Sequence, residues 1–415
     1  MRKYGCIGKK LTHSFSREIH SRLADYKYDL IELSEDEVST FLDKKNFEAV
    51  NVTIPYKQTV IPHLDSVSDI AQRIGAVNTI VNRDGKLYGY NTDYYGMKSL
   101  IERVGLSLKG KKVLILGTGG TCRTATVVAA DMVASEIFAV SRRKSDGYID
   151  YNEATTTHSD AQIIINTTPV GMYPDCESSP IDISAFDQLE GVIDVVYNPL
   201  VTNLVLDAKA KGIKAEGGLY MLVMQAVFAV EKFLDIEIPK DVADRVFTEM
   251  LSTKENIVLT GMPGSGKSTV GQLINLDGFE FVDTDAEIEK RCGCSIKELF
   301  TTKGEQHFRD LETEVIRDVS AKSSCIISTG GGAILREENV RALKRNGKLF
   351  FMDAEPSRLC ATEDRPLSDT EDKLARLYNE RINIYRSTAD VIVPDLETPE
   401  AEAEYILAKR LELNR

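Results

Sequence analysis

A glycine-rich stretch at residues 258–269 has the residue types and spacing that could hold a nucleotide triphosphate. It contains the pattern G-x-x-x-x-G-K-S, with an apolar run before it and a helical pattern after it. Glycines let successive backbone N–H groups turn toward a phosphate, the lysine can reach the β- and γ-phosphates, and the serine can bind Mg²⁺. A surface turn would also be glycine-rich, but the flanking strand and helix favour a phosphate loop. The residues expected to contact nucleotide are Gly261, Gly264, Ser265, Gly266, Lys267, Ser268 and Thr269.

Acids and arginines after this loop suggest a phosphoryl acceptor site. Asp283 and Asp285 lie two residues apart at a strand end and point to one face, where the first can bind Mg²⁺ and the second can face an acceptor hydroxyl. Arg309 and Arg381 can clamp a carboxylate, and Arg365 lies where a mobile loop could cover phosphates. A solvated surface position is the ordinary alternative for each arginine. The Asp-x-Asp pair alone does not separate one small-metabolite kinase from another.

A second glycine turn, at residues 117–120, is typical of dinucleotide binding. Gly117 allows a tight turn after an apolar strand, and Gly119 lets the backbone approach a pyrophosphate. A plain strand-to-helix turn explains this motif equally well, so the next strand decides. It ends in Ser141, Arg142 and Arg143, where an NAD site would carry an acid. Guanidinium groups suit a 2′-phosphate, so NADP is the expected cofactor.

Polar residues fall at the ends of apolar runs in the first ~100 positions, a stretch about as long as one domain or lobe. Strand ends border the ligand crevice of open α/β sheets, so a hydroxyl-rich or carboxylate-bearing small molecule is the natural occupant. Each residue alone could instead be a turn former or a helix cap. The set is Ser14, Ser16, Asn51, Thr53, Lys57, Asn78, Thr79, Asn91, Thr92 and Asp93.

Length and composition indicate a soluble protein of several domains. A chain of 415 residues predicts two or three domains. The net charge is −6 over residues 1–253 and −7 over residues 254–415, so neither half resembles a basic nucleic-acid binder. Seven scattered cysteines suggest reduced thiols in the cytoplasm. No signal peptide or membrane-spanning run is visible, so no membrane partner is expected.

Alternating apolar runs and helical patterns predict an α/β fold throughout. We expect an α/β substrate lobe at residues 1–100, to which helices of residues 226–252 return, and a Rossmann lobe at residues 101–225. Further parallel strands are expected at residues 161–166, 167–172 and 192–196. A buried helix at residues 221–234 carries the polar Gln225, which needs a partner or a ligand. A flexible link at residues 253–256 should lead into a phosphate-loop domain with a parallel sheet at residues 253–415.

The first part of the chain resembles shikimate dehydrogenases. The resemblance lies in residues 13–16 (HSFS), 51–57 (NVTIPYK), 75–79 (GAVNT), 91–93 (NTD), 117–120 (GTGG), 166–168 (NTT), 194–198 (DVVYN) and 218–225 (GLYMLVMQ). It implies that Lys57 and Asp93 are the catalytic pair. It also implies substrate contacts from Ser14, Ser16, Thr53, Asn78, Tyr197 and Gln225, and cofactor contacts from Gly117, Gly119, Gly120, Ser141, Arg142 and Arg143.

The second part resembles shikimate kinases from about residue 254 to the end, over the size of one domain. By this resemblance Lys267, Ser268 and Asp283 serve the nucleotide and Mg²⁺, and Arg365 is the lid arginine. Shikimate would be bound by Asp285, Arg309, Gly330, Gly331, Gly332 and Arg381. Asp285 and Lys267 would act in catalysis.

These features predict a bifunctional enzyme that reduces 3-dehydroshikimate with NADPH and phosphorylates the resulting shikimate with ATP and Mg²⁺. One alternative is a quinate/shikimate dehydrogenase fused to a related small-metabolite kinase. Another is a nucleotide-sensing protein without catalysis, whose signature would be loss of Lys57, Asp93, Lys267 or Asp285. All four residues are present.

Overall fold

The computed structural model describes residues 4–11, 15–359 and 370–414. The chain divides into two compact units, Met1–Met250 and Leu251–Arg415. Within the described ranges each unit is built from sheets covered by helices, which confirms the predicted α/β class. No helix in these ranges is both long enough and apolar enough to cross a membrane.

A mixed sheet opens the first unit, with strand order β2-β1-β3-β5-β6-β4. The strands β1, β2 and β3 are parallel, whereas β5 is antiparallel to β3 and to β6. Its register pairs Asn51 with Thr79 and Thr79 with Tyr90, so the polar ends of three strands meet at one edge. The strands are β1 (Tyr4–Gly8), β2 (Tyr28–Glu32), β3 (Ala49–Val52), β4 (Ser66–Val67), β5 (Thr79–Arg83) and β6 (Lys86–Tyr90).

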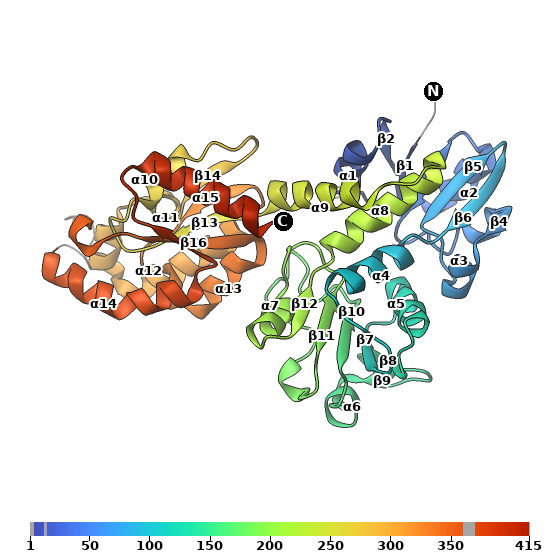
Figure 1. Ribbon diagram of the computed structural model, residues 1–415, viewed down its shortest axis with the longest axis horizontal. Helices are drawn as coiled ribbons and strands as arrows, with labels where there is room; N and C mark the ends of the chain where they lie inside the picture. The colour runs from blue at the N-terminus through green and yellow to red at the C-terminus, as the bar shows by residue number, and fades with distance from the viewer. Residues whose placement is uncertain (1–3, 12–14, 360–369, 415) are drawn as a thin grey trace. The chain divides into compact units, whose positions relative to one another are not determined.

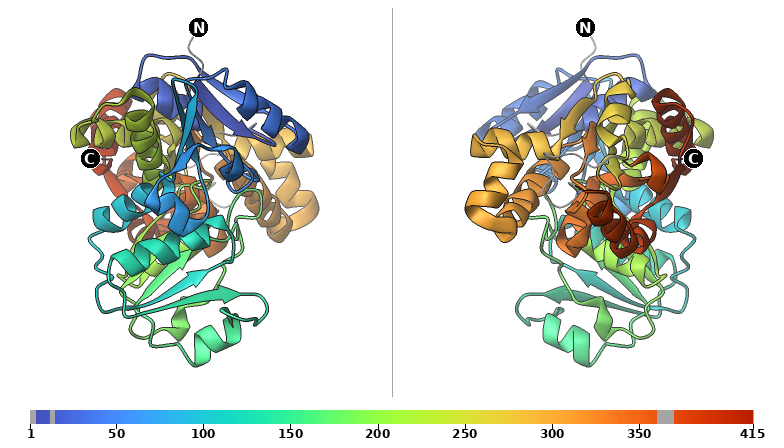
Figure 2. Two further views of the ribbon diagram at one scale, coloured as in Figure 1. Left: turned by 90° about the vertical axis from the view of Figure 1, so that its right-hand side faces the viewer. Right: turned by 90° about the vertical axis from the view of Figure 1, so that its left-hand side faces the viewer.

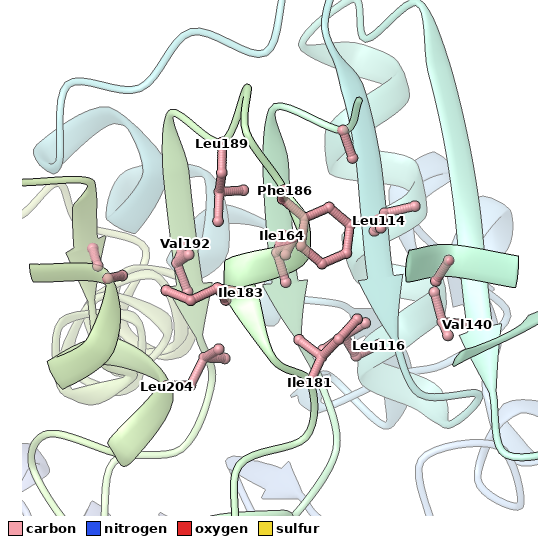
Figure 3. Packing of buried hydrophobic residues seen from close by; sticks show 14 of the residues in the cluster. Leu114, Leu116, Val140, Ile164, Ile181, Ile183, Phe186, Leu189, Val192 and Leu204 are labelled. Carbon is pink, nitrogen blue, oxygen red and sulfur yellow. The ribbon is translucent and has the colours of Figure 1, made fainter. Parts of the chain in front are cut away.

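A second sheet of the first unit is parallel throughout, in the order β12-β11-β10-β7-β8-β9. Figures 1 and 2 show it in green, as a layer separate from the blue strands of the first sheet. Leu114, Ile164 and Val192 from neighbouring strands pack on one face with Phe186 and Leu204 (Figure 3). The strands are β7 (Lys112–Leu116), β8 (Glu136–Ser141), β9 (Ile149–Asp150), β10 (Ile163–Asn166), β11 (Gly191–Asp194) and β12 (Lys214–Glu216).

Helices α4 and α8 pack closely in the first unit, as Figure 1 shows. A Cβ atom at Gly96 of α4 would lie 2.6 Å from the carbonyl oxygen of Met221, so this crossing requires glycine. The domain boundaries expected at residues 100 and 225 fall inside these two helices. The helices are α1 (Ser16–Leu23), α2 (Glu35–Lys44), α3 (Asp69–Ile74), α4 (Asp93–Arg103), α5 (Gly120–Asp131), α6 (Tyr151–Thr156), α7 (Asn203–Ala210), α8 (Leu219–Leu234) and α9 (Lys240–Lys254).

The second unit has one parallel sheet in its described part, in the order β14-β15-β13-β16-β17. Its central strand β13 is buried along its whole length, as expected for a strand with both faces covered. The strands are β13 (Asn256–Thr260), β14 (Glu280–Asp283), β15 (Cys325–Ser328), β16 (Gly347–Asp353) and β17 (Val391–Pro394). The helices are α10 (Lys267–Leu273), α11 (Thr284–Cys292), α12 (Ile296–Ser320, broken at Gly304), α13 (Glu337–Asn346), α14 (Glu371–Thr388) and α15 (Pro399–Leu413).

The strand expected at residues 167–172 was a wrong prediction. The chain leaves β10 at Asn166 and turns through residues 167–172 without entering a sheet. Pro169 has no N–H for a strand ladder, and Gly171 has a φ of 87°, which directs the chain away from extended structure.

The flexible link expected at residues 253–256 was also wrong. Helix α9 continues to Lys254, and β13 begins at Asn256. Arg410 of α15 donates to the carbonyl oxygens of Ser252 and Glu255, and Asn414 Nδ2 lies 3.2 Å from a carboxylate oxygen of Glu255. These buried donors satisfy carbonyls that a helix end otherwise leaves unpaired, so the segment is ordered by hydrogen bonds.

Candidate active sites

The predicted catalytic pair of the first unit is in direct contact. Lys57 follows strand β3, and Asp93 is the first residue of α4. Lys57 Nζ lies 2.6 Å from Asp93 Oδ2, and the two side chains are 25% and 14% exposed. The carbonyl of Lys57 also accepts a hydrogen bond from the N–H of Val77 at 2.8 Å, which fixes the turn that carries the lysine. An ammonium held in this way can donate a proton to an oxygen that develops negative charge.

A buried amide network lies at the same sheet edge and surrounds Asn78. The Oδ1 atom of Asn78 accepts from the N–H of Thr92 at 2.7 Å and from Thr79 Oγ1 at 3.0 Å. Its Nδ2 donates to Thr92 Oγ1 at 3.1 Å. Thr79 also accepts from Asn51, which in turn accepts from the hydroxyl of Tyr28. These contacts fix the orientation of the Asn78 amide, because reversing it would face donors with donors.

Three further predicted substrate residues are placed by this unit. Ser16 begins α1, and the adjacent Phe15 ring lies 5.5 Å from the ring of Tyr197, measured between centroids. Tyr197 follows β11, so this contact brings the second sheet's edge to the start of α1. Thr53 directly follows β3, and its N–H donates to the carbonyl of Ile7 at 3.0 Å. The predicted contact Ser14 lies outside the described residues.

Gln225 lies on α8 beside the first turn of α4. A Cβ atom at Gly96 would lie 3.1 Å from Gln225 Cβ, and Gly96 is one turn after Asp93. The side chain is half-buried rather than fully enclosed, and its Nε2 donates to the carbonyl of Leu222 at 2.9 Å. The partner that the sequence required for this amide is therefore its own helix, while the residue itself packs against α4 one turn after Asp93.

The glycine turn after β7 has the geometry of a dinucleotide site. Gly117 has a φ of 113°, and a Cβ atom there would lie 2.8 Å from Thr167 Oγ1, so the turn requires glycine. Above Gly119 the space is open, since a Cβ atom would meet no heavy atom of the described chain within 4 Å. Gly120 is the first residue of α5, so a pyrophosphate placed here would meet the start of that helix.

The cations after β8 differ in their surroundings. Ser141 Oγ accepts from the N–H of Arg143 at 3.1 Å and forms a small turn at the strand end. Lys144 Nζ lies 2.6 Å from a carboxylate oxygen of Glu153, and that pairing raises the pKa of Lys144. Arg142 and Arg143 are exposed. The two guanidinium groups predicted to contact a 2′-phosphate are thus exposed beside the Ser141 turn.

A buried carboxylate organises the edge that carries Tyr197. Asp194 ends β11 and accepts from Thr202 Oγ1 at 2.7 Å, Asn166 Nδ2 at 2.9 Å and the N–H of Val196 at 3.0 Å. Burial raises the pKa of Asp194 to about 6, although these three donors act in the opposite direction. The carboxylate therefore holds the ends of β10 and β11 together through neutral donors.

The phosphate loop of the second unit has the expected backbone. Gly261, Gly264 and Gly266 have φ values of 153°, 83° and 82°, which side chains rarely permit. Lys267 is buried, and its Nζ donates to the carbonyls of Gly261 and Met262 at 2.9 and 2.8 Å. The ammonium therefore lies folded against its own loop, within reach of a phosphate that would replace these carbonyls.

The predicted Mg²⁺ ligands lie next to each other. Ser268 Oγ donates to Asp283 Oδ2 at 2.6 Å and lies 3.1 Å from Ser328 Oγ. The other oxygen of Asp283 accepts from the N–H groups of Asp285 and Ala286 and caps helix α11. One hydroxyl and one carboxylate leave most of an octahedral Mg²⁺ shell to phosphate oxygens and water, as is usual for this ion. The residues present therefore fit Mg²⁺.

The triple glycine at residues 330–332 lets three separate elements approach one loop. A Cβ atom on the first glycine would lie 2.6 Å from Asp285 Oδ1, on the second 2.8 Å from Cδ of Pro263, and on the third 2.2 Å from Nη1 of Arg309. Side chains at these positions would displace the acid, the phosphate loop and the guanidinium. Only glycine brings all three together.

Each arginine of the predicted carboxylate clamp in the second unit has a hydrogen-bond partner within that unit. Arg309 donates to Glu312 at 2.8 Å, and Arg381 donates to the carbonyl of Gly331 at 3.1 Å. Burial raises the pKa of Glu312, which the Arg309 guanidinium opposes. The predicted lid residue Arg365 lies outside the described residues.

A cavity of about 540 Å³ joins the phosphate and acceptor groups of the second unit. Its lining includes Gly264, Gly266, Lys267, Ser268, Thr269, Asp283, Asp285, Arg309, Gly330, Gly331, Gly332 and Arg381. One open cavity therefore brings together groups that could bind a triphosphate, a metal ion and an acidic acceptor.

Two supporting residues were not predicted from the sequence. Glu312 lies three residues after Arg309 and Tyr385 lies four residues after Arg381, spacings that place both members of each pair on one helix face. That spacing was a usable signal. The Tyr385 hydroxyl contacts the carbonyls of Gly261 and Gly331, and the spacing could not predict these contacts with two separate loops.

Comparison with known proteins places the two units in two families. The substrate-binding domain of shikimate dehydrogenase matches residues 6–80, and the shikimate kinase family matches residues 263–411. A shikimate dehydrogenase (NADP⁺) from Clostridium perfringens is 37% identical over 268 residues, which covers 60% of this chain and 98% of that protein.

Solved structures agree with the match of the first unit. A chorismate mutase/shikimate 5-dehydrogenase fusion protein from Clostridium acetobutylicum has a TM-score of 0.58 at 34% identity, covering 60% of this chain and 96% of that one. Shikimate 5-dehydrogenase from Thermus thermophilus in complex with NADP(H) and shikimate has a TM-score of 0.55 at 28% identity, covering 60% and 99%. This chain belongs to the shikimate dehydrogenase family over its first unit and carries a shikimate kinase domain in its second.

Proposed function

We propose that the first unit reduces 3-dehydroshikimate to shikimate with NADPH, and that the second unit phosphorylates shikimate with ATP to shikimate 3-phosphate. The observation that carries the proposal is the presence of one complete set of reactive groups in each unit. Lys57 contacts Asp93 at 2.6 Å in the first, and Lys267, Asp285 and Arg309 line one cavity in the second.

In the first unit the residues of the chain supply a proton to the substrate. NADPH supplies a hydride to the carbonyl carbon of the substrate when it is bound. Lys57 donates a proton to the oxygen that receives the electron pair, and Asp93 stabilises and orients the ammonium before that transfer. Ser14, Ser16, Thr53, Asn78, Tyr197 and Gln225 would hold the carboxylate and hydroxyl groups of the substrate.

Selection of NADP over NAD rests on the segment after β8. Arg142, Arg143 and Ser141 would bind the 2′-phosphate, while the turn at Gly117, Gly119 and Gly120 would hold the pyrophosphate. Lys144 contributes less, because its ammonium already pairs with Glu153 at 2.6 Å.

In the second unit the residues position and neutralise phosphates. Lys267 would leave the carbonyls of its own loop for the β- and γ-phosphates, and Ser268 and Asp283 would hold Mg²⁺. Asp285 would accept the proton of the attacking hydroxyl. Arg309 and Arg381 would bind the substrate carboxylate, and Arg365 would cover the nucleotide.

Location in the cytoplasm is part of this proposal. Both cofactors are supplied there, and the buried thiols Cys6, Cys122 and Cys176 would stay reduced.

The test is a single reaction that starts from 3-dehydroshikimate with NADPH, ATP and Mg²⁺. We expect ADP to appear in the same amount as NADPH disappears, after a lag in which shikimate accumulates. Omitting NADPH should prevent ADP formation, and added shikimate should restore it. Reduction without ADP formation would refute the kinase assignment, and no change in either nucleotide would favour a sensing protein. Faster turnover of quinate than of shikimate in the reverse oxidation would favour the quinate alternative.

A further inference from the structure

Tyr385 lies between the two binding regions of the second unit. It is on α14, one helical turn after Arg381, and its side chain is completely buried. The ring stacks on Phe351 of β16, with centroids 5.0 Å apart and planes 2° from parallel. This packing fixes the ring, so the hydroxyl has a defined position.

The hydroxyl of Tyr385 contacts one carbonyl from each binding loop. It lies 3.0 Å from the carbonyl oxygen of Gly261, which opens the phosphate loop, and it also contacts the carbonyl of Gly331 in the triple glycine. Each carbonyl has a second donor. Lys267 donates to Gly261 at 2.9 Å, and Arg381 donates to Gly331 at 3.1 Å. A continuous chain of hydrogen bonds thus links the phosphate-loop lysine to the acceptor-site arginine.

A phenol has a single proton to share between these carbonyls. Burial raises the pKa of Tyr385, so the group remains a donor. While Lys267 donates to Gly261, the phenol proton is available to Gly331. A phosphate that attracts Lys267 removes a donor from Gly261. Since a buried carbonyl that loses its donor is destabilised, the phenol proton then favours Gly261.

This exchange has a consequence for the acceptor site. When the phenol proton turns to Gly261, the carbonyl of Gly331 depends on Arg381 as its donor. The guanidinium of Arg381, which lines the cavity, is then held more firmly in one orientation. A fixed guanidinium binds a carboxylate with less loss of conformational entropy.

We propose that Tyr385 is a positioning residue that couples nucleotide binding in the phosphate loop to shikimate binding at Arg381. The inference rests on the proposed kinase function and adds a path between its two sites. By thermodynamic reciprocity, shikimate should raise nucleotide affinity by the same factor by which nucleotide raises shikimate affinity.

The test compares wild type with Tyr385→Phe, which keeps the ring and its stacking and removes one oxygen atom. The probe is ADP that carries a fluorescent methylanthraniloyl group. The full chain is titrated with this probe in the presence of Mg²⁺, once without shikimate and once with saturating shikimate. Shikimate at the dehydrogenase site does not change this signal directly, since the fluorophore reports the nucleotide. We expect shikimate to tighten nucleotide binding to wild type, and the factor to fall roughly 2- to 13-fold in Tyr385→Phe, which corresponds to one neutral hydrogen bond.

Tyr378→Phe is the matched control, because it removes a phenol oxygen from the same helix and Tyr378 makes neither carbonyl contact described above. Its coupling factor should equal that of wild type. Equal coupling in wild type and Tyr385→Phe, or no coupling in a wild type that phosphorylates shikimate, would overturn the proposal. Weaker nucleotide binding with unchanged coupling would assign the hydroxyl to the phosphate loop alone and would also overturn it. Failure of wild type to phosphorylate shikimate would instead refute the kinase function itself.

Discussion

The two lysines to which we assign reactive roles, one in each unit, are held in different ways. Lys57 pairs with the side chain of Asp93, which is 36 residues away in the sequence and belongs to another element. Lys267 donates to carbonyls only five and six residues before it, within its own loop. The first lysine is thus placed by the tertiary fold, and the second by local backbone geometry.

This difference indicates how each site meets its ligand. Lys57, the proposed proton donor of the first unit, already contacts Asp93, so substrate could bind without breaking that pair. In the second unit Lys267 is bound to carbonyls, Ser268 to Asp283, and Arg309 to Glu312. In the proposed function, phosphate and Mg²⁺ would replace some of these partners. Binding there is an exchange of hydrogen bonds, and hydrogen-bond exchange is a means of coupling one ligand to another.

The largest expected effect comes from removing each lysine in turn. Lys57→Ala should lower reduction of 3-dehydroshikimate by roughly 10²- to 10⁴-fold, because general-acid catalysis is lost, and should leave phosphorylation of added shikimate unchanged. Lys267→Ala should lower phosphorylation by roughly 10²- to 10³-fold and leave reduction unchanged. Both activities are measured on each purified chain. Equal loss of both activities in a folded variant would contradict the assignment of two separate sites.

The sequence predicted the local parts of both sites better than the long-range ones. The phosphate loop and the dinucleotide turn depend on glycines whose φ values follow from their motif, so spacing was sufficient. The Lys57–Asp93 pair came only from a family resemblance, because no periodicity connects positions so far apart. The ordered junction at Glu255 was missed for a related reason. It depends on Arg410 and Asn414, which are more than 150 residues away.

Buried carboxylates provide the next comparison. Asp194 of the first unit has three neutral donors, whereas Glu312 of the second has a guanidinium partner. The pKa of Asp194 is raised from 3.8 to about 6, so the folded state binds this proton more tightly than the unfolded state does. Its contribution to stability is complete below pH 3.8 and is lost as the pH rises through about 6.

The raised pKa of Asp194 predicts how the free energy of unfolding changes with pH. Between pH 4 and pH 7, the free energy of unfolding of wild type should fall by about 2 kcal/mol relative to that of Asp194→Asn, which is most of what a shift from 3.8 to about 6 implies. Urea unfolding followed by circular dichroism at several pH values gives the difference. The transition of the second unit in the same samples is the control. A constant difference across this range would show that Asp194 does not titrate there.

Cofactor choice distinguishes two neighbouring cations of the first unit. Arg142→Ala should weaken NADP binding by roughly 10- to 150-fold and NAD binding much less, through loss of one charge-assisted hydrogen bond. Lys144→Ala should have a smaller effect, since its ammonium pairs with Glu153. Michaelis constants for NADPH and NADH are measured for both variants. If Arg142→Ala raises both constants equally, the guanidinium does not bind the 2′-phosphate.

The smallest expected effects concern surface ion pairs, one in each unit. Arg73 pairs with Asp131 at 2.5 Å, and Arg386 pairs with Asp353 at 2.9 Å. The side chains are 48% and 30% exposed in the first pair and 49% and 18% in the second. Solvent screens such pairs, so Arg73→Ala and Arg386→Ala should each lower the free energy of unfolding by less than about 1 kcal/mol.

The first pair has an additional partner that makes the comparison sharper. Asp131 also accepts from the hydroxyl of Tyr94 at 2.8 Å, so Asp131→Ala removes the ion pair and this hydrogen bond, whereas Arg73→Ala removes only the ion pair. Asp131→Ala should therefore destabilise the first unit more than Arg73→Ala does. Salt at 0.5 M should reduce the stability loss of Arg73→Ala, but most of the difference in stability between the two variants should remain. Urea unfolding at low and high salt measures both quantities. If the two variants lose the same stability, the Tyr94 hydroxyl contributes nothing, and Asp131 is an ordinary surface charge like Asp353.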